Sequence, residues 1–201
     1  SGVSHDLRTP LTRLRLGLSM LDGEDTAALI RDVDDMQELL DAFLDFARND
    51  ALDGLELCSP RLILHSAVSD VARSGQKIVL RSMSGSEQKV SLRPMAVRRA
   101  LDNLIGNSLR YGTMAEVCLD VTDRTVRFTV EDDGPGIPSS SREAAMSPFV
   151  RLDHSRNQDK GTGVGLGLSI VSDIARNHGG LLRLSDSMRL GGLKAELVLA
   201  R

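Results

Sequence analysis

The spacing of apolar residues predicts two helices at the start of the chain. Apolar positions recur at three- and four-residue steps, at Val3, Leu7, Leu11, Leu14, Leu18 and Leu21. This period places them on one face of a helix. A polar turn over residues 22–26 interrupts the pattern, and a second seam of the same period runs from residue 29 to residue 47. The chain is therefore expected to begin with an antiparallel helical hairpin over residues 1–50.

The predicted hairpin carries more apolar surface than it can bury alone, because each of its two helices has its own stripe. Pairing of two copies into a four-helix bundle would cover both stripes. We therefore expect a homodimer formed through the hairpin. A bare intramolecular coiled-coil arm is the alternative.

The pattern changes after a polar break, which we interpret as a linker over residues 51–60. Helical periods then occur at 62–72, 96–110 and 169–177, and runs typical of strands at 77–83, 89–92, 116–122, 125–131, 181–185 and 194–200. A long polar loop runs from 134 to 163. Because strands and helices do not alternate strictly, residues 61–201 are expected to form an α+β sandwich, with helices on one face of a mixed sheet.

Composition narrows the possible partners. Apolar residues make up 41% of the 201 residues but aromatic residues only 2%, with no Trp, so the core must be aliphatic. A net charge of −3 without a basic stripe argues against nucleic acid or an anionic membrane surface as the main partner. Cys58 and Cys118 lack metal-ligand spacing and are interpreted as reduced, partly buried thiols of a cytosolic protein. No run of about 18 apolar residues is present, so this stretch is not expected to span a membrane.

Candidate chemistry begins with the stretch HDLRTP at residues 5–10, on the first predicted helix. A neutral imidazole is a nucleophile near pH 7, and the carboxylate of Asp6 can orient that of His5 or take its proton. Thr9 follows His5 by about one helical turn. Pro10 removes a backbone donor, which makes this turn deformable. Taken alone, the His-Asp pair also fits a solvated helix face.

A second candidate is a polar helix face within residues 102–111. Asn103, Asn107, Arg110 and Tyr111 lie at i, i+4, i+7 and i+8 and share one face. An amide oxygen can ligate Mg2+, which keeps waters and takes phosphate oxygens for its other positions. The guanidinium of an arginine suits phosphate oxygens. An ordinary solvated surface is the alternative.

Two glycine-containing stretches complete the set. The pattern D-x-G-x-G at 132–136 follows a predicted strand, so the carboxylate at the strand end can accept a hydrogen bond from an exocyclic amine such as that of adenine. The run GTGVGLGL at 161–168 opens a predicted helix, where backbone N–H groups and the positive helix end can cradle phosphate. It matches neither a P-loop nor a Rossmann fingerprint. Each pattern alone also occurs in ordinary turns.

In this order, the Asn-bearing helix, the D-x-G-x-G turn and the glycine-rich loop resemble the GHKL-type ATP-binding module. That module occurs in sensor histidine kinases, Hsp90-type chaperones, mismatch-repair ATPases and type II topoisomerases. The HDLRTP stretch on a hairpin resembles the phosphoacceptor box of the histidine kinases and selects that family. The form SHDLRTPLTR is similar to the osmosensor-like branch, whose partners are OmpR-type response regulators.

The resemblance implies roles on the first domain. His5 matches the histidine that is phosphorylated by the γ-phosphate of ATP. Asp6 matches its assisting carboxylate. Together with Thr9, Asp6 is expected to position a water that removes phosphate from the response regulator. The sequence therefore predicts phosphatase as well as kinase activity.

The resemblance also implies an ATP and Mg2+ site on the second domain. Asn107 matches the Mg2+ ligand and Asn103 a supporting polar residue. The remaining expected contacts to the nucleotide and its phosphates are Arg110, Tyr111, Asp132, Gly134, Gly136, Arg151, Gly163, Gly165, Leu166 and Gly167. Among these, Asp132 matches the adenine-recognising carboxylate and Arg151 a γ-phosphate contact. Residues 151–163 match the mobile lid over ATP.

Two positions depart from the family pattern. Met146 stands where the F-box usually begins with an aromatic residue, so anchoring of the lid can differ. Val164 stands where the second glycine box usually carries Thr or Ser, which removes one hydroxyl contact to phosphate.

The sequence therefore predicts a protein-histidine kinase that phosphorylates itself on His5 and passes the phosphate to an aspartate of a response regulator. One alternative is an ATP-binding interaction module without kinase activity. Another is a chaperone- or topoisomerase-like ATPase, which would leave the HDLRTP hairpin without a role. The chain starts without Met inside an amphipathic pattern, so we expect a preceding N-terminal part. By resemblance that part would hold membrane spans, with this region facing the cytoplasm.

Overall fold

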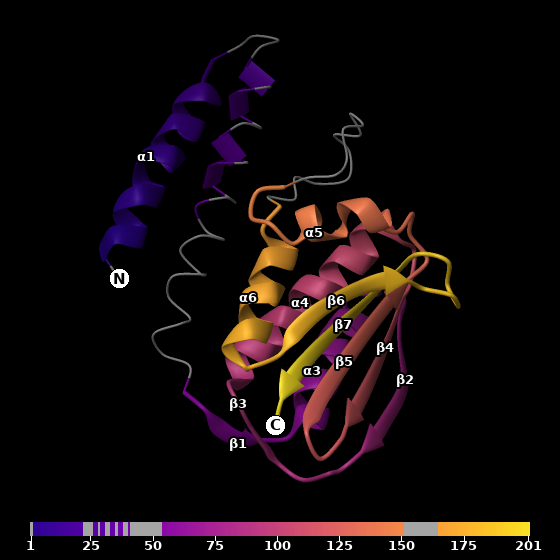
Figure 1. Cartoon of the computed structure of the whole chain (residues 1–201). Helices are drawn as coiled ribbons and strands as arrows, with labels where there is room; N and C mark the ends of the chain where they lie inside the picture. Colours follow the sequence, from indigo (N-terminus) through magenta and orange to yellow (C-terminus); the bar gives the residue numbers. More distant parts are fainter. Residues whose placement is uncertain are drawn as a thin grey trace. The chain divides into compact units, whose positions relative to one another are not determined.

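A computed structural model describes residues 2–21, 26–27, 29–30, 33–34, 36–37, 40, 54–150 and 165–201, with side chains from Thr9 onward. The chain divides into two compact units, of which the first holds the residues up to Leu52 and the second begins at Asp53. Figure 1 shows both units. Each unit is described by itself below.

The first unit contains the first predicted helix and parts of the second. Helix α1 spans Gly2–Leu18 and includes Pro10. The described residues between 26 and 40 are also helical, and an ion pair of 2.7 Å between Arg15 Nε and Asp34 Oδ1 joins them to α1. Several apolar side chains of both stretches are exposed, namely Leu14, Leu16, Met20, Leu21, Leu29 and Met36. The single chain thus leaves uncovered the kind of surface from which a dimer was predicted. The rest of the second seam, from residue 41, lies outside the described residues.

The second unit is built on a five-stranded sheet in the order β2-β4-β5-β7-β6. Its strands are β2 (Ile78–Gly85), β4 (Ala115–Val121), β5 (Thr125–Asp132), β6 (Leu181–Asp186) and β7 (Leu193–Ala200). β2 and β4 are parallel, whereas every other neighbouring pair is antiparallel. The predicted mixed sheet is confirmed, including the hairpin between β4 and β5.

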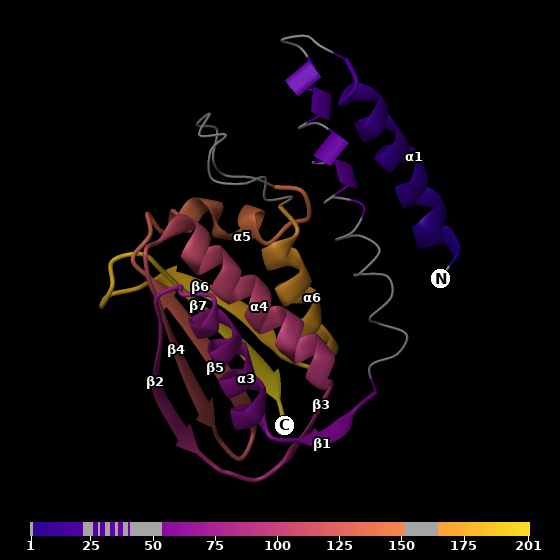
Figure 2. The ribbon, with the colours of Figure 1, turned by 180° about the vertical axis from the view of Figure 1, so that it is seen from behind.

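Three helices cover one face of this sheet: α3 (Pro60–Arg73), α4 (Pro94–Tyr111) and α6 (Gly167–Asn177). They lie behind the strands in Figure 1 and in front of them in Figure 2. The core between helices and sheet is aliphatic apart from Phe128, as composition requires. α4 buries Leu101, Leu104 and Ile105 against the sheet, so the helical period turns its polar residues away from the core.

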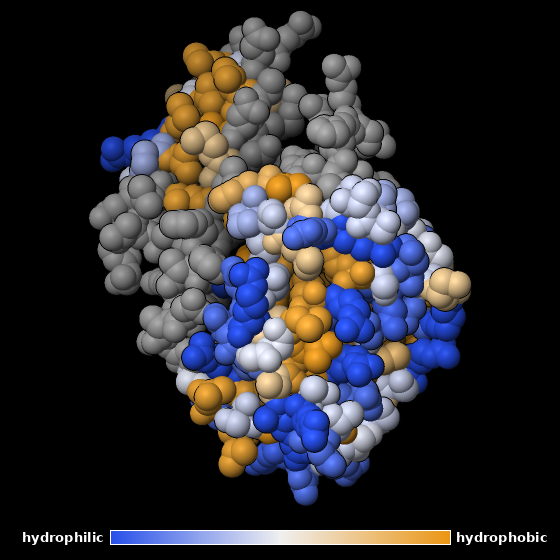
Figure 3. Space-filling view, viewed as in Figure 1, coloured by the Kyte–Doolittle hydropathy of each residue, from blue (hydrophilic) through white to orange (hydrophobic). Residues whose placement is uncertain are grey.

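The opposite sheet face carries charged residues. Figure 3 shows hydrophilic residues on either side of a band of hydrophobic ones that runs down the middle of this side. Residues of β4, β5 and β7 form ion pairs there, for example Arg127 with Glu196 at 3.9 Å. Charged side chains allow a sheet face to contact water without a second helical layer. Within the described residues, no helix is both long and apolar enough to cross a membrane.

Two expectations need correction. Residues 56–58, assigned to the linker, form β1 (Glu56–Cys58), which pairs with β3 (Val90–Leu92) in a separate two-stranded sheet. A three-residue strand has too few positions to show alternation in a sequence. The expected loop from 134 contains the 3-10 turn η1 (Ser139–Ser141) and the short helix α5 (Arg142–Ala145), which are too brief to show a helical period.

Candidate functional site

The polar face of α4 meets the start of α6. A Cβ on Gly167 would lie 3.2 Å from Asn103 Oδ1 and 3.2 Å from Asn107 Nδ2, so only glycine lets the two helices approach this closely without displacing these amides. The Asn103 amide is also fixed from the other side, because its Nδ2 donates to the carbonyl oxygen of Arg99 at 2.9 Å. Two residues predicted from the helix face and one from the glycine run are thus brought together.

The α6 end of this contact offers backbone donors. Leu166 is the N-cap of α6, and its carbonyl oxygen accepts hydrogen bonds from the backbone N–H of Ile170 and the hydroxyl of Ser169. The first N–H groups of a helix have no intrahelical acceptor. They point out of the helix beside Asn107, where an anion is favoured by the helix dipole.

Asp132 ends β5 and is 4% exposed. Its Oδ1 accepts hydrogen bonds from the backbone N–H groups of Gly134 and Leu193, both at 3.0 Å. Its Oδ2 accepts none from the described residues. The carboxylate is therefore oriented by the backbone through one oxygen, and the other stays available to a donor from a ligand.

The turn after Asp132 adjoins the end of α4. A Cβ on Gly134 would lie 3.1 Å from the carbonyl carbon and oxygen of Tyr111. Gly136 adopts φ +71°, a backbone conformation that favours glycine. The side chains of Arg110 and Tyr111 are exposed and make no hydrogen bond or ion pair with any described residue. The D-x-G-x-G turn and the polar helix face thus form one continuous site.

A second carboxylate fixes this junction. Asp133 accepts hydrogen bonds from the Thr113 hydroxyl, from Thr113 N–H at 2.7 Å and from Met114 N–H at 3.0 Å. These bonds, the hydroxyl first, lower the pKa of Asp133 from 3.8 to about 2. The negative charge at neutral pH therefore ties the segment after α4 to the end of β5.

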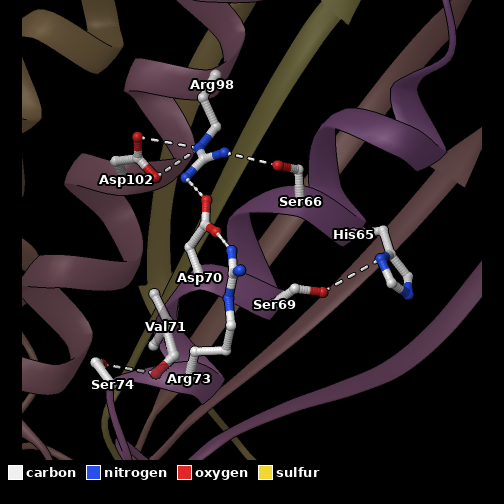
Figure 4. A network of polar contacts seen from close by, with 9 residues as sticks. All are labelled: His65, Ser66, Ser69, Asp70, Val71, Arg73, Ser74, Arg98 and Asp102. Atoms are coloured by element: carbon white, nitrogen blue, oxygen red, sulfur yellow. Dashed lines mark hydrogen bonds and ion pairs between the residues drawn. The ribbon is translucent and has the colours of Figure 1, made fainter.

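An ion-pair network fixes α4 against α3 (Figure 4). Arg98 donates to Asp70 Oδ2 at 2.6 Å, to Asp102 Oδ1 at 2.9 Å and to the Ser66 hydroxyl at 3.0 Å. Asp70 also binds Arg73. The hydrogen bonds from Arg98 and then Arg73 hold the pKa of Asp70 below its usual value. Since Asp102 precedes Asn103, the network holds the helix from which the site amides project.

A backbone hydrogen bond joins the residues that flank the segment predicted as a lid. Phe149 N–H donates to the Gly165 carbonyl oxygen at 3.0 Å, which brings the described residues on both sides of it together. Arg151 and Gly163 lie outside the described residues. On α1 the backbone positions of His5 and Asp6 are described but not their side chains, whereas the Thr9 side chain is half-buried.

The strand predicted at 194–200 is confirmed as β7 (Leu193–Ala200), but sequence reasoning missed its contact with Asp132. Leu193 supplies one of the two N–H donors, and a Cβ on Gly192 would overlap Asp132 Oδ1. The Gly191-Gly192 pair before the strand could have indicated this close approach of the backbone to another residue. The role of Asp133 was also missed, because two consecutive carboxylates do not reveal which one binds the segment after α4.

Comparison with known domains matches both units. The His Kinase A (phospho-acceptor) domain matches residues 1–52, and the histidine kinase-, DNA gyrase B- and HSP90-like ATPase domain matches residues 92–200. The chain belongs to this ATPase family and, through the phospho-acceptor domain, to its sensor histidine kinases.

Individual relatives agree. Sensor protein RstB of Escherichia coli is 38% identical, covering 96% of this chain and 46% of RstB. Sensor histidine kinase GtrS of Pseudomonas aeruginosa is 36% identical, covering 100% and 41%. Among solved structures, the histidine kinase domain of the E. coli osmosensor EnvZ has a TM-score of 0.55 at 32% identity, covering 73% of this chain and 89% of that one. The chain spans less than half the length of these curated relatives.

Proposed function

We propose that the second unit binds ATP with Mg2+ and that its γ-phosphate is transferred to His5. The observation that carries this proposal is the Asp132 carboxylate, with one oxygen held by backbone donors and the other available, continuous with the amide face of α4 and the N-terminus of α6. A similar structure, full-length ShkA, was solved in complex with AMPPNP; it has a TM-score of 0.62 at 26% identity and covers 99% of this chain and 44% of ShkA.

The site residues divide the nucleotide between them. Asp132 would accept a hydrogen bond from the adenine amine, with Gly134 and Gly136 shaping the turn around it. Arg110 and Tyr111 would reach the phosphates and the nucleotide. The start of α6, with Gly163, Gly165, Leu166 and Gly167, would bind phosphate through backbone N–H groups, and Arg151 would contact the γ-phosphate.

The metal position fits an amide ligand. Among the described residues no group of three or more His, Cys, Asp or Glu could hold a metal ion. Mg2+ takes few protein ligands when phosphate oxygens and waters supply the rest, and the half-buried Asn107 amide beside Gly167 suits that mode. A bound Mg2+ would offset negative charge on the phosphates during transfer.

The transfer uses α1. A nitrogen of His5 forms a bond to the γ-phosphorus, the bond from phosphorus to the bridging oxygen breaks, and ADP leaves. Asp6 orients the imidazole and takes its proton. The phosphate would then pass to an aspartate of a response regulator, of the OmpR type by similarity to the osmosensor branch. Dephosphorylation of that regulator would use a water positioned by Asp6 and Thr9.

Assembly and location follow from the same family. We propose that the exposed apolar residues of the first unit pair in a homodimer, and that this region works on the cytoplasmic side of a membrane sensor whose spans lie outside it. We also propose a first domain over residues 1–50 and a second domain that begins at β1 rather than at residue 61, because β1 pairs with β3 and α3 begins at Pro60.

A transfer experiment tests the function. The chain is phosphorylated with γ-labelled ATP, freed of nucleotide and mixed with an OmpR-type receiver domain. Label should move to the receiver as a base-labile acyl phosphate. Addition of the chain with ADP to phosphorylated receiver should then release phosphate, and Thr9→Ala should abolish that release but keep labelling. Tight ATP binding without any labelled protein would favour the interaction module instead.

A further inference from the structure

The connection between β6 and β7 completes the environment of Asp132. Leu193 N–H donates to Asp132 Oδ1 at 3.0 Å, and Gly192 N–H donates to the Asp132 carbonyl oxygen at 3.1 Å. One of the two hydrogen bonds that orient the carboxylate therefore comes from Leu193, the first residue of β7, directly after the hairpin connection formed by residues 187–192. If that connection shifts, the carboxylate loses the hydrogen bond from Leu193 and keeps only the one from Gly134.

The connection is held by Ser187, which is 2% exposed. Its hydroxyl donates to Glu131 Oε2 at 2.5 Å and accepts from Leu190 N–H at 3.0 Å. Its backbone N–H donates to the Gly192 carbonyl oxygen at 2.8 Å. Ser187 thus fixes both ends of the turn and ties it to the residue before Asp132.

The sheet supplies a reason for this attachment. Glu131 on β5 lies directly opposite Glu116 on β4, and two like charges in that position repel each other. Arg189 of the connection forms an ion pair with Glu116, and Ser187 binds Glu131. Arg81 lies further from Glu116, at 3.7 Å. Of the two opposed carboxylates, Glu131 therefore accepts a hydrogen bond from the connection and Glu116 forms an ion pair with it.

We propose that Ser187 and Arg189, bound to the opposed carboxylates of Glu131 and Glu116, are positioning residues that hold Asp132 for recognition of an adenine base. This inference rests on the proposed nucleotide site. Adenine presents an amine donor where guanine presents a carbonyl acceptor. A carboxylate oxygen held in place accepts a hydrogen bond from the adenine amine and repels the guanine carbonyl. The connection therefore sets both the affinity for an adenine nucleotide and the preference for adenine over guanine.

The test compares ADP and GDP binding to the whole chain by titration, with thermal unfolding of each variant measured in parallel. Arg189→Gln and Ser187→Ala should weaken ADP binding roughly tenfold, which corresponds to about 1.4 kcal/mol. The dissociation constant for GDP should change by less than about twofold. Arg189→Lys, which keeps the charge, should restore part of the preference. Arg127→Gln is the matched control, since Arg127 pairs with Glu196 on the same sheet face away from this connection.

The outcomes separate the two proposals. If the unmodified chain prefers ADP and the Arg189 and Ser187 variants keep that preference while their unfolding temperatures fall as in the control, the connection is only structural and the inference is wrong. If the unmodified chain binds neither nucleotide, the proposed function itself fails. Should Ser187→Ala not fold, the comparison of Arg189→Gln with Arg189→Lys decides.

Discussion

The Asn107 amide and the Gly167 backbone depend on each other at the scale of single residues. The 3.2 Å approach to a Cβ that Gly167 lacks means that any side chain there must push the amides of the neighbouring helix aside. Gly106, one residue before Asn107, has open space around its Cβ position. Two glycines of the same site region therefore have opposite expected responses to substitution.

Gly167→Ala should weaken binding of an adenine nucleotide about tenfold, because the Cβ displaces the two amides. This change corresponds to a loss of about 1.4 kcal/mol in binding free energy. Gly106→Ala should leave binding unchanged and raise the free energy of unfolding by about 0.5–1 kcal/mol, because alanine loses less backbone entropy in a helix. Titration calorimetry and urea unfolding of both variants check this pair. Equal affinity for Gly167→Ala and the unmodified chain would contradict the proposed role of the contact.

Asp133 gives a pH dependence with a defined sign. Its folded pKa is about 2, below the reference value of 3.8. The folded chain therefore binds fewer protons between these values, so the stabilisation is fully present above about pH 4 and is lost as the pH falls toward 2. The difference in unfolding free energy between the unmodified chain and Asp133→Asn should shrink over that window. A difference that stays constant from pH 7 to pH 3 would show that the Thr113 and Met114 bonds do not depend on the charge.

At the scale of elements, α4 carries the site because one of its faces packs against the sheet and the other presents polar side chains. The period of three and four residues that buries Leu101, Leu104 and Ile105 turns Asn103 and Asn107 outward. The Arg98 network then fixes the helix laterally to α3 through Asp70 and Ser66. Orientation of the amide face thus depends on polar contacts that lie away from the proposed nucleotide site.

Arg98→Ala should lower the free energy of unfolding by about 2 kcal/mol, because removal of the half-buried guanidinium breaks its hydrogen bonds to two carboxylates. Arg73→Ala is the control: its side chain is 77% exposed and binds the same Asp70, so the expected loss is below about 1 kcal/mol. Urea denaturation followed by circular dichroism measures both. Similar losses for the two variants would mean that Arg98 does not join the helices.

Local periodicity made much of this architecture predictable. The helix around Asn103 and Asn107 and the hairpin of β4 and β5 follow from repeats within a few residues. β1 and α5 did not, because they are too short to repeat a pattern. The Asp132–Leu193 hydrogen bond joins residues 61 positions apart, so only the sheet register could reveal it. The sequence indicated which residue types gather at the site, but not which carboxylate oxygen is occupied.

At the scale of the whole molecule, the proposed reaction requires groups from both units. α1 carries His5, whereas the proposed nucleotide contacts lie on α4, β5 and α6. The first unit also exposes apolar residues that a single chain does not cover, such as Leu14 at 50%. A partner chain is the simplest source of cover for them.

Leu14→Lys should shift the chain from dimer to monomer in light scattering after size-exclusion chromatography, because a charge in the seam opposes burial there. Met188→Lys is the control, since Met188 is 95% exposed on the second unit. A chain that is monomeric before substitution, or a dimer that survives Leu14→Lys, would contradict pairing through this hairpin.

Incubation with γ-labelled ATP and Mg2+, followed by acid and base treatment, tests the central claim most directly. The unmodified chain should acquire label that is lost in acid and survives base, as expected for phosphohistidine, and His5→Gln should acquire none while still binding ATP. Label of the same amount on His5→Gln, or label that survives acid, would show that His5 is not the acceptor.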